Sequence, residues 1–113
     1  MSTKVKVVNL TGDVVLSTVE HHRSSLLENF EENEIVLASL SQTKEIDLFG
    51  IQLLYAAKRH ARRLGKEFHL TGAVSDDVAH RLWEAGFTDE VIHDGRELDN
   101  RLHEFLKGDP DHA

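Results

Sequence analysis

The chain has 113 residues, which fits one domain with its own core, and its 40% hydrophobic and 29% charged residues are typical of globular proteins. Its formal net charge of −7 argues against nucleic-acid binding, because there is no basic surplus to neutralise phosphates. There is no cysteine, no signal-peptide pattern and no apolar run near the ~20 residues that cross a membrane, so we expect a cytoplasmic protein that does not span a membrane.

The first third of the chain predicts two strands and a helix. Residues 5–10 are rich in valine with interleaved lysines, which is typical of an edge strand. Residues 11–13 form a predicted turn, after which residues 14–16 are expected to return antiparallel to the first strand. Thr18 is placed to cap a first helix. The residues at its inner positions are Val19, Leu26, Leu27 and Phe30.

The centre of the chain predicts a buried strand, a loop of about six residues and a long helix. Residues 35–38 are an uncharged apolar run, and Asp47 lies where the N-cap of the following helix belongs. Apolar positions then recur at helical spacing: Gly50, Leu53, Leu54, Ala57, Ala61 and Leu64. The basic residues between Lys58 and Lys66 are interpreted as a solvated face, and Gly65 supplies the C-terminal stop.

The last third predicts a strand at residues 68–70, a helix capped by Ser75 and closed at Gly86, and a short edge strand at residues 91–92. A final helix is expected from Asp94 or Gly95, followed by a polar tail at residues 108–113. The apolar stripe of that helix is Leu98, Leu102, Phe105 and Leu106. The predicted order is ββαβαβαβα, in a single α/β domain over residues 1–107 with a mixed β-sheet and about four helices.

The central helix has a second face, opposite its apolar stripe, that should meet water although it is partly apolar. This face holds Leu48, Gln52, Tyr55 and Arg59, flanked by Phe49 and Ile51. Two interpretations stay open at this stage. Either the apolar residues are covered by another part of the chain or are ordinary exposed hydrophobic residues, or they form a surface that docks another protein.

No catalytic constellation is evident. Eight histidines and twenty acidic residues could in principle form a metal or acid–base site, but His60, His80 and His103 each stand alone on a different predicted helix. The sequence has no HExxH motif, no glycine-rich phosphate loop and no nucleophile elbow. We therefore predict no enzyme activity, no metal ligand and no cofactor.

The strand–loop–helix at the centre resembles the STAS domain of the anti-anti-sigma factors. In that family a strand ends in a pattern like L-S-G-V-x-x-x-D-S-S-G-L, and a helix follows. Leu40, Ser41, Asp47, Gly50 and Ile51 fit this pattern without a gap. The resemblance extends from Val5 to about Leu106, and it implies a STAS-like domain over residues 1–107 that acts by binding other proteins.

One departure from the family pattern changes the expected function. In partner-switching members the residue after the Asp is a Ser or Thr that a kinase phosphorylates, whereas this chain has Leu48. We therefore expect constitutive docking through the start of the central helix. The residues expected to bind the partner are Asp47, Leu48, Phe49, Ile51, Gln52, Tyr55 and Arg59. Ser41 and Thr43 are the remaining candidate phosphosites.

The resemblance implies a protein partner in bacterial signalling: an anti-sigma factor or kinase-like protein, or a chemotaxis kinase. Two alternatives stay open. The chain could be an accessory subunit of a phospholipid transport system, with a transporter ATPase as partner, or a STAS domain that binds a small ligand. A homodimer through the exposed helix face is a further alternative.

Overall fold

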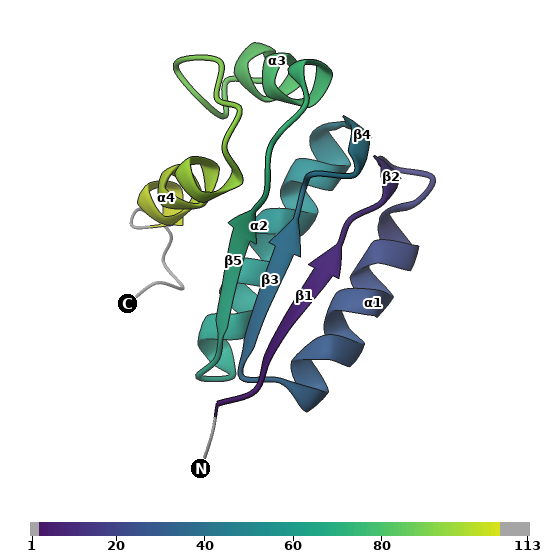
Figure 1. Ribbon diagram of the computed structural model, residues 1–113, viewed down its shortest axis with the longest axis vertical. Helices are drawn as coiled ribbons and strands as arrows, with labels where there is room; N and C mark the ends of the chain where they lie inside the picture. The colour runs from purple at the N-terminus through teal and green to yellow at the C-terminus, as the bar shows by residue number, and fades with distance from the viewer. Residues whose placement is uncertain (1–2, 107–113) are drawn as a thin grey trace.

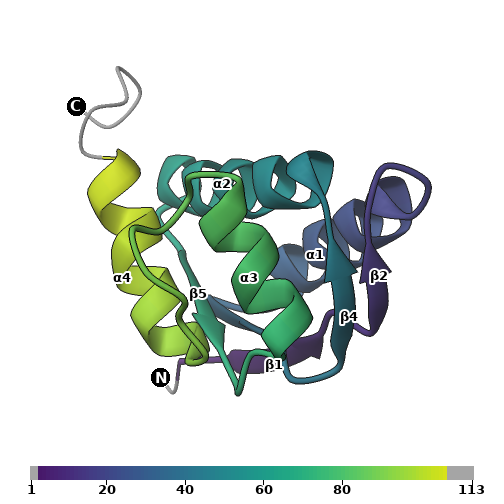
Figure 2. The ribbon, with the colours of Figure 1, turned by 90° about the horizontal axis from the view of Figure 1, so that it is seen from above.

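Two long helices cover one face of a three-stranded parallel sheet (Figures 1 and 2). The structure, a computed structural model, describes residues 3–106 and the side chains of residues 3–102. Strands β1 (Val5–Asn9), β3 (Ile35–Ser39) and β5 (Glu67–Thr71) form the sheet in the order β1-β3-β5. Helices α1 (Val19–Glu32) and α2 (Leu48–Arg63) pack against the same face. The remaining helices are α3 (Asp76–Glu84) and α4 (Gly95–Leu106).

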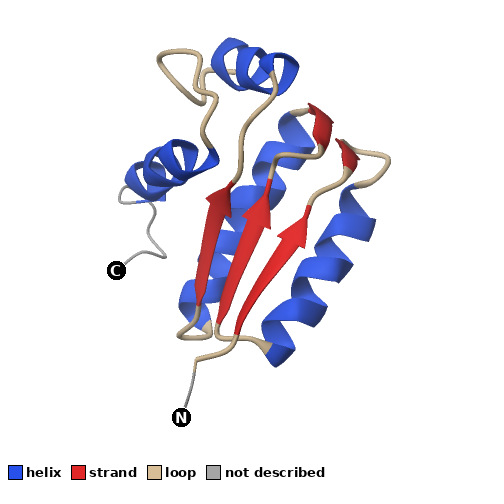
Figure 3. Cartoon of the chain, in the orientation of Figure 1, coloured by secondary structure: helices blue, strands red, loops and turns tan. Residues whose placement is uncertain are grey.

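The core lies between the sheet and helices α1 and α2. Side chains alternate between the two faces of each strand, so Val8, Val36 and Phe68 point to the helices and are buried. None of the helices described between residues 3 and 106 covers the opposite face, and Val5 and Val7 on β1 are about half exposed there. Figure 3, in the same orientation, shows this side of the strands facing the viewer with no described helix in front of it.

The predicted hairpin at the N-terminus does not form. Strand β2 (Gly12–Val14) instead pairs in parallel with β4 (Thr43–Ile46). The sequence predicts a loop, and not a strand, where β4 lies. The chain does not reverse at residues 10–12, because the amide of Leu10 donates to the carbonyl of Ser39 and the amide of Gly12 donates to that of Gln42. β1 and β2 therefore run in the same direction beside β3 and β4, and every strand pairing between named strands is parallel.

The outer edge of β5 is closed by a buried ion pair. Lys58 on α2 and Asp99 on α4 approach to 3.1 Å, and the two residues are 6% and 9% exposed. Lys58 Nζ donates to the carbonyl of Phe68 and Asp99 Oδ1 accepts from the amide of Leu70, so two backbone groups on the edge of β5 are satisfied by this pair. The prediction that Lys58 belongs to a solvated basic face is wrong.

The segment between α3 and α4 is a loop, and the edge strand predicted at residues 91–92 is absent. A single antiparallel bridge joins Ala73 to Asp94, and Ile92 is buried as an apolar anchor of the loop. The starts of α3 and α4 match the prediction: the side chain of Ser75 accepts from the amide of Val78, and α4 begins at Gly95. Thr18 precedes α1 as predicted, but its side chain makes no cap hydrogen bond and donates instead to the carbonyl of Asp13.

The predicted fold class, an α/β domain with four helices, is confirmed, but the named strands form two parallel sheets and not the expected mixed sheet. The observed element order is ββαββαβαα, because β4 forms and the strand at 91–92 does not. The side chains of Phe105 and Leu106 and the predicted tail at residues 108–113 lie outside the described part. The first residues of β1 lie at the end of the sheet opposite to β2 and β4, and α3 lies between α4 and β4 (Figures 1 and 2).

Candidate functional site

Asp47 joins the start of α2 to the end of β2. Its Oδ1 accepts a hydrogen bond from the amide of Gly50 at 2.9 Å, which is the N-cap geometry predicted from the sequence. Its Oδ2 accepts from the amide of Leu16 at 2.9 Å, and its own amide donates to the carbonyl of Val14. One carboxylate therefore fixes both the first turn of α2 and the loop that follows β2.

Gly50 is required because α2 starts almost in contact with β2. A Cβ at this position would lie 2.1 Å from the carbonyl oxygen of Val14 and 2.8 Å from a side-chain carbon of Ile46. No side chain fits in that space. The Asp-x-x-Gly pattern therefore combines a cap with a close backbone approach.

The first turn of α2 presents apolar side chains to solvent. Leu48 is 59% exposed and Phe49 is 45% exposed. Leu16, in the loop held by Asp47, is 60% exposed, and Gln52 follows one turn further along the helix. We call Leu16, Leu48, Phe49 and Gln52 the docking surface. Exposed apolar residues in one place are typical of an interaction site.

Three other residues of the predicted helix face lie deeper. Ile51 is only 4% exposed and packs in the core, so its expected place on the partner-binding face is corrected: it lies three residues before the buried Leu54, at the edge of the apolar stripe of the helix. Tyr55 is half-buried, with its ring 5.3 Å from that of Phe87. Burial raises the pKa of Tyr55 to about 12. Arg59 is also half-buried.

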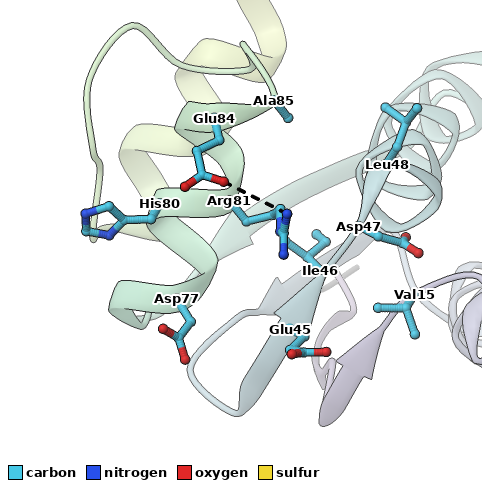
Figure 4. A pocket seen from close by; sticks show the side chains of 10 residues that line it. All are labelled: Val15, Glu45, Ile46, Asp47, Leu48, Asp77, His80, Arg81, Glu84 and Ala85. Carbon is cyan, nitrogen blue, oxygen red and sulfur yellow. Dashed lines mark ion pairs between the residues drawn. The ribbon is translucent and has the colours of Figure 1, made fainter.

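A cleft of about 810 Å³ separates the start of α2 from α3, next to Leu48 (Figure 4). Asp77, Arg81 and Glu84 project from α3, and Glu45 and Asp47 lie on the opposite side. The other residues that line it are Val15, Ile46, Leu48, His80 and Ala85. The cleft therefore combines an apolar part with a charged rim.

Comparisons with known proteins identify the family. A sequence profile of the STAS domain matches residues 2–105. This chain belongs to the STAS domain family. The Asp47 cap and the Gly50 contact therefore give a physical reason for the Asp-x-x-Gly that the STAS pattern contains. No curated protein matches this STAS domain significantly.

Among the solved structures that share the fold of this STAS domain, two illustrate the similarity. One is described as the anti-sigma factor antagonist SpoIIAA in its unphosphorylated form, with 18% identity, a TM-score of 0.50, and 62% of this chain and 66% of that chain covered. The other is a sulfate transporter family protein from Wolinella succinogenes, with 18% identity, a TM-score of 0.55, and 91% and 88% covered. At this identity the similarity concerns the fold alone.

The two candidate phosphosites of this STAS domain differ in accessibility. Thr43 is 3% exposed, and its hydroxyl donates to the carbonyl of Leu10 at 2.6 Å, so in this fold a kinase cannot reach it. Ser41 is exposed, with its hydroxyl 2.9 Å from that of Ser39. Of the two, only Ser41 offers an accessible hydroxyl.

Neither a metal cluster nor a membrane-spanning helix is found in the part of the STAS domain that the structure describes. Among those residues, no three His, Cys, Asp or Glu side chains are grouped so that they could hold a metal ion. The same residues include no helix with the length and apolar character that a membrane crossing needs.

Sequence reasoning missed the contribution of Leu16 and of α3 to this region. Leu16 was placed in a strand, although a leucine followed by Ser17 and the cap residue Thr18 is compatible with an exposed loop. Asp77 follows the predicted cap residue Ser75, and nothing in the sequence indicates that it lines the same cleft as Glu45. Only the tertiary packing of α3 beside β4 brings these residues together.

Proposed function

We propose that this STAS domain is a non-enzymatic adaptor that binds a protein partner through the docking surface. The observation that supports this most directly is the exposure of Leu48 and Phe49 at the start of α2, at 59% and 45%. Burial of an exposed leucine by a partner stabilises a complex by about 2 kcal/mol. Leu48 also has no hydroxyl, so docking here does not depend on phosphorylation of that residue.

The geometry of the helix start favours a protein over a small anionic ligand. Helix N-termini often bind anions through their free amides. Here the carboxylate of Asp47 already accepts from the amide of Gly50 and brings negative charge to the same place. A phosphate-bearing ligand would meet that charge, whereas an apolar protein side chain would meet Leu48 and Phe49.

We further propose a role in bacterial signalling, with an anti-sigma factor, a kinase-like protein or a chemotaxis kinase as partner. The structural neighbour described as an anti-sigma factor antagonist supports this setting. The neighbour from a sulfate transporter family supports the alternative of a transport accessory protein that contacts a transporter ATPase. A histidine kinase gene beside this gene would favour the first setting, and a transporter ATPase gene would favour the second.

The experiment compares partner capture from native lysate by the wild-type chain and by the Leu48→Glu variant, with mass spectrometry of what is retained. We expect the variant to lose the partner, with an affinity at least ~30-fold weaker, because about 2 kcal/mol of apolar burial is lost. Melting and circular dichroism should change little, since Leu48 is exposed in the free protein.

Leu64→Glu is the matched control, because Leu64 is 49% exposed at the opposite end of α2. It should retain the partner as the wild-type chain does. If Leu48→Glu captures the same partner with unchanged affinity, the start of α2 is not the docking surface and the proposal is wrong.

A further inference from the structure

The docking surface borders a region in which carboxylates outnumber cations. Beside the main cleft lies a second hollow of about 530 Å³, and both are lined by Glu45 and Asp77. The carboxylates that line the two hollows are Asp13, Glu45, Asp47, Asp77 and Glu84. The lysine and arginine side chains that line them are Lys44 and Arg81. A surface of this kind selects its partner by the sign of its charge.

Three of these carboxylates are not neutralised within the fold. The carboxylate of Asp47 accepts from two backbone amides, and that of Glu84 lies 3.9 Å from Arg81. Asp13, Glu45 and Asp77 form no ion pair with any residue that the structure describes. Their charge is therefore available to a partner.

The strand register brings two of these carboxylates onto adjacent strands. Asp13 on β2 and Glu45 on β4 are direct cross-strand partners. Like charges directly opposite one another on neighbouring strands destabilise a sheet. A cation placed beside this pair would relieve the repulsion, so the complex would gain more from a positive charge here than it would from the same charge near an isolated acid.

We propose that the partner of this STAS domain presents a basic segment, with an arginine or lysine side chain that enters the cleft beside Glu45 and Asp77 and an apolar side chain that covers Leu48. The inference rests on the proposed docking function and specifies the chemistry of the partner. An anionic surface, such as a phospholipid headgroup layer or a nucleic acid, would be repelled by the same residues.

The experiment selects random sixteen-residue peptides, displayed on phage, on the immobilised full chain. We expect the enriched sequences to combine at least two arginine or lysine residues with a leucine, isoleucine, methionine or aromatic residue. The best sequence is then synthesised and its Kd is measured at low and at physiological salt. Affinity should fall as salt rises, because exposed charges are screened.

The decisive comparison uses two variants with the same change in net charge. Glu45→Gln with Asp77→Asn should weaken binding of the synthetic peptide about fivefold to tenfold, the effect of removing two rim ion pairs. Glu28→Gln with Glu31→Gln should change it less than about twofold by the same reasoning. These control residues are exposed near the C-terminal end of α1, at the amino ends of the strands and away from the cleft.

The outcomes separate the inference from the docking function itself. Peptides that bind more weakly to Leu48→Glu and also to the double variant Glu45→Gln with Asp77→Asn support the docking function and the basic-partner inference. Peptides that bind more weakly to Leu48→Glu but bind the Glu45→Gln and Asp77→Asn double variant as they bind the wild type overturn the basic-partner inference. They still support the docking function. Acidic or uncharged enriched sequences, equal effects of the two charge variants, or no enrichment at all also overturn the inference.

Discussion

Asp47 shows how one side chain can connect two elements that are distant in sequence. Its two oxygens accept from the amides of Gly50 and Leu16, so the loop after β2 and the first turn of α2 share one anchor. This anchor determines where Leu16 and Leu48 lie relative to each other. The apolar docking surface therefore depends on a polar residue that takes no part in the apolar contact itself.

Tyr55 gives a residue-scale prediction, because it is the only tyrosine in the chain. Burial raises its pKa from 10.0 to about 12, so the folded state favours the neutral phenol. Its contribution to stability is fully present below pH 10 and is lost as the pH rises through about 12. An alkaline titration of the folded protein, followed by tyrosinate absorbance, should therefore have its midpoint near pH 12.

Tyr55→Phe is the control for this titration. It should remove the absorbance change and the part of the alkaline destabilisation that depends on this phenol. Ionisation of Tyr55 in the folded wild-type protein near pH 10, the value without burial, would contradict the prediction.

At the scale of elements, α2 is the helix through which the sheet, the docking surface and α4 are connected. Its N-terminal turn rests on β2 at Gly50, its first exposed residues form most of the docking surface, and Lys58 in its second half reaches α4. A change in how this helix packs would therefore move the docking surface as well as the core.

Gly50→Ala tests the contact between α2 and β2. Alanine is favoured over glycine by about 1 kcal/mol inside a helix. The new Cβ would, however, lie 2.1 Å from the backbone carbonyl oxygen of Val14, which cannot move away as a flexible side chain could. We expect a net loss of about 2 kcal/mol or more in the free energy of unfolding, measured by urea denaturation.

The reverse substitution elsewhere in α2 supplies the comparison. Ala56 is exposed, so Ala56→Gly should cost only the helix-propensity difference of about 1 kcal/mol. A Gly50→Ala protein as stable as the wild type would show that the approach of α2 to β2 is looser than described.

The main elements were predictable because their signals are local. The apolar run at β3, the helical spacing of α2 and the Asp47 cap are all confirmed. Strand β4 was not predicted, because its buried residues Thr43 and Ile46 are separated by two exposed charged residues and form no apolar run. Its pairing with β2 also depends on residues that are about thirty positions away in the sequence. The same limit applies to the docking region, where the loop of Leu16 and helix α3 meet only in the folded chain.

Lys58 was misassigned although the sequence contained a signal. It lies four residues after Leu54 and three before Ala61, on the apolar stripe of α2, and both of those residues are buried. A lysine on such a stripe either extends its amine to solvent or meets an acid, and its position alone does not distinguish these outcomes. Only the packing of α4 provides Asp99.

At the scale of the whole molecule, the Lys58–Asp99 pair connects both halves of the chain. It joins α2 to α4 and satisfies the backbone edge of β5 between them, through Phe68 and Leu70. His69 Nδ1 also lies 2.9 Å from Asp99 Oδ2. A buried pair of this kind is costly to break, because removal of one partner leaves the other charge buried without compensation.

Asp99→Ala should therefore lower the free energy of unfolding by about 3–5 kcal/mol. The double variant Lys58→Met with Asp99→Leu should lose less than the sum of the two single variants, because no lone charge remains. Urea denaturation measures both. Asp89→Ala, which removes an exposed partner of Arg101, is the control and should cost at most about 1 kcal/mol.

Equal effects of Asp99→Ala and Asp89→Ala would mean that the buried pair does not hold α4 in place. Additive single and double variants would lead to the same conclusion.

The positions of the first strand and the last helix have a practical consequence for such measurements. β1 begins at the amino end of the sheet, and α4 lies across α3 from the cleft, so neither end of the described chain borders the docking surface (Figures 1 and 2). A biosensor tag or fluorescent fusion joined beyond either end of the described chain would therefore be linked to the domain at a point away from the docking surface. Immobilisation through each terminus in turn should yield the same peptide affinity.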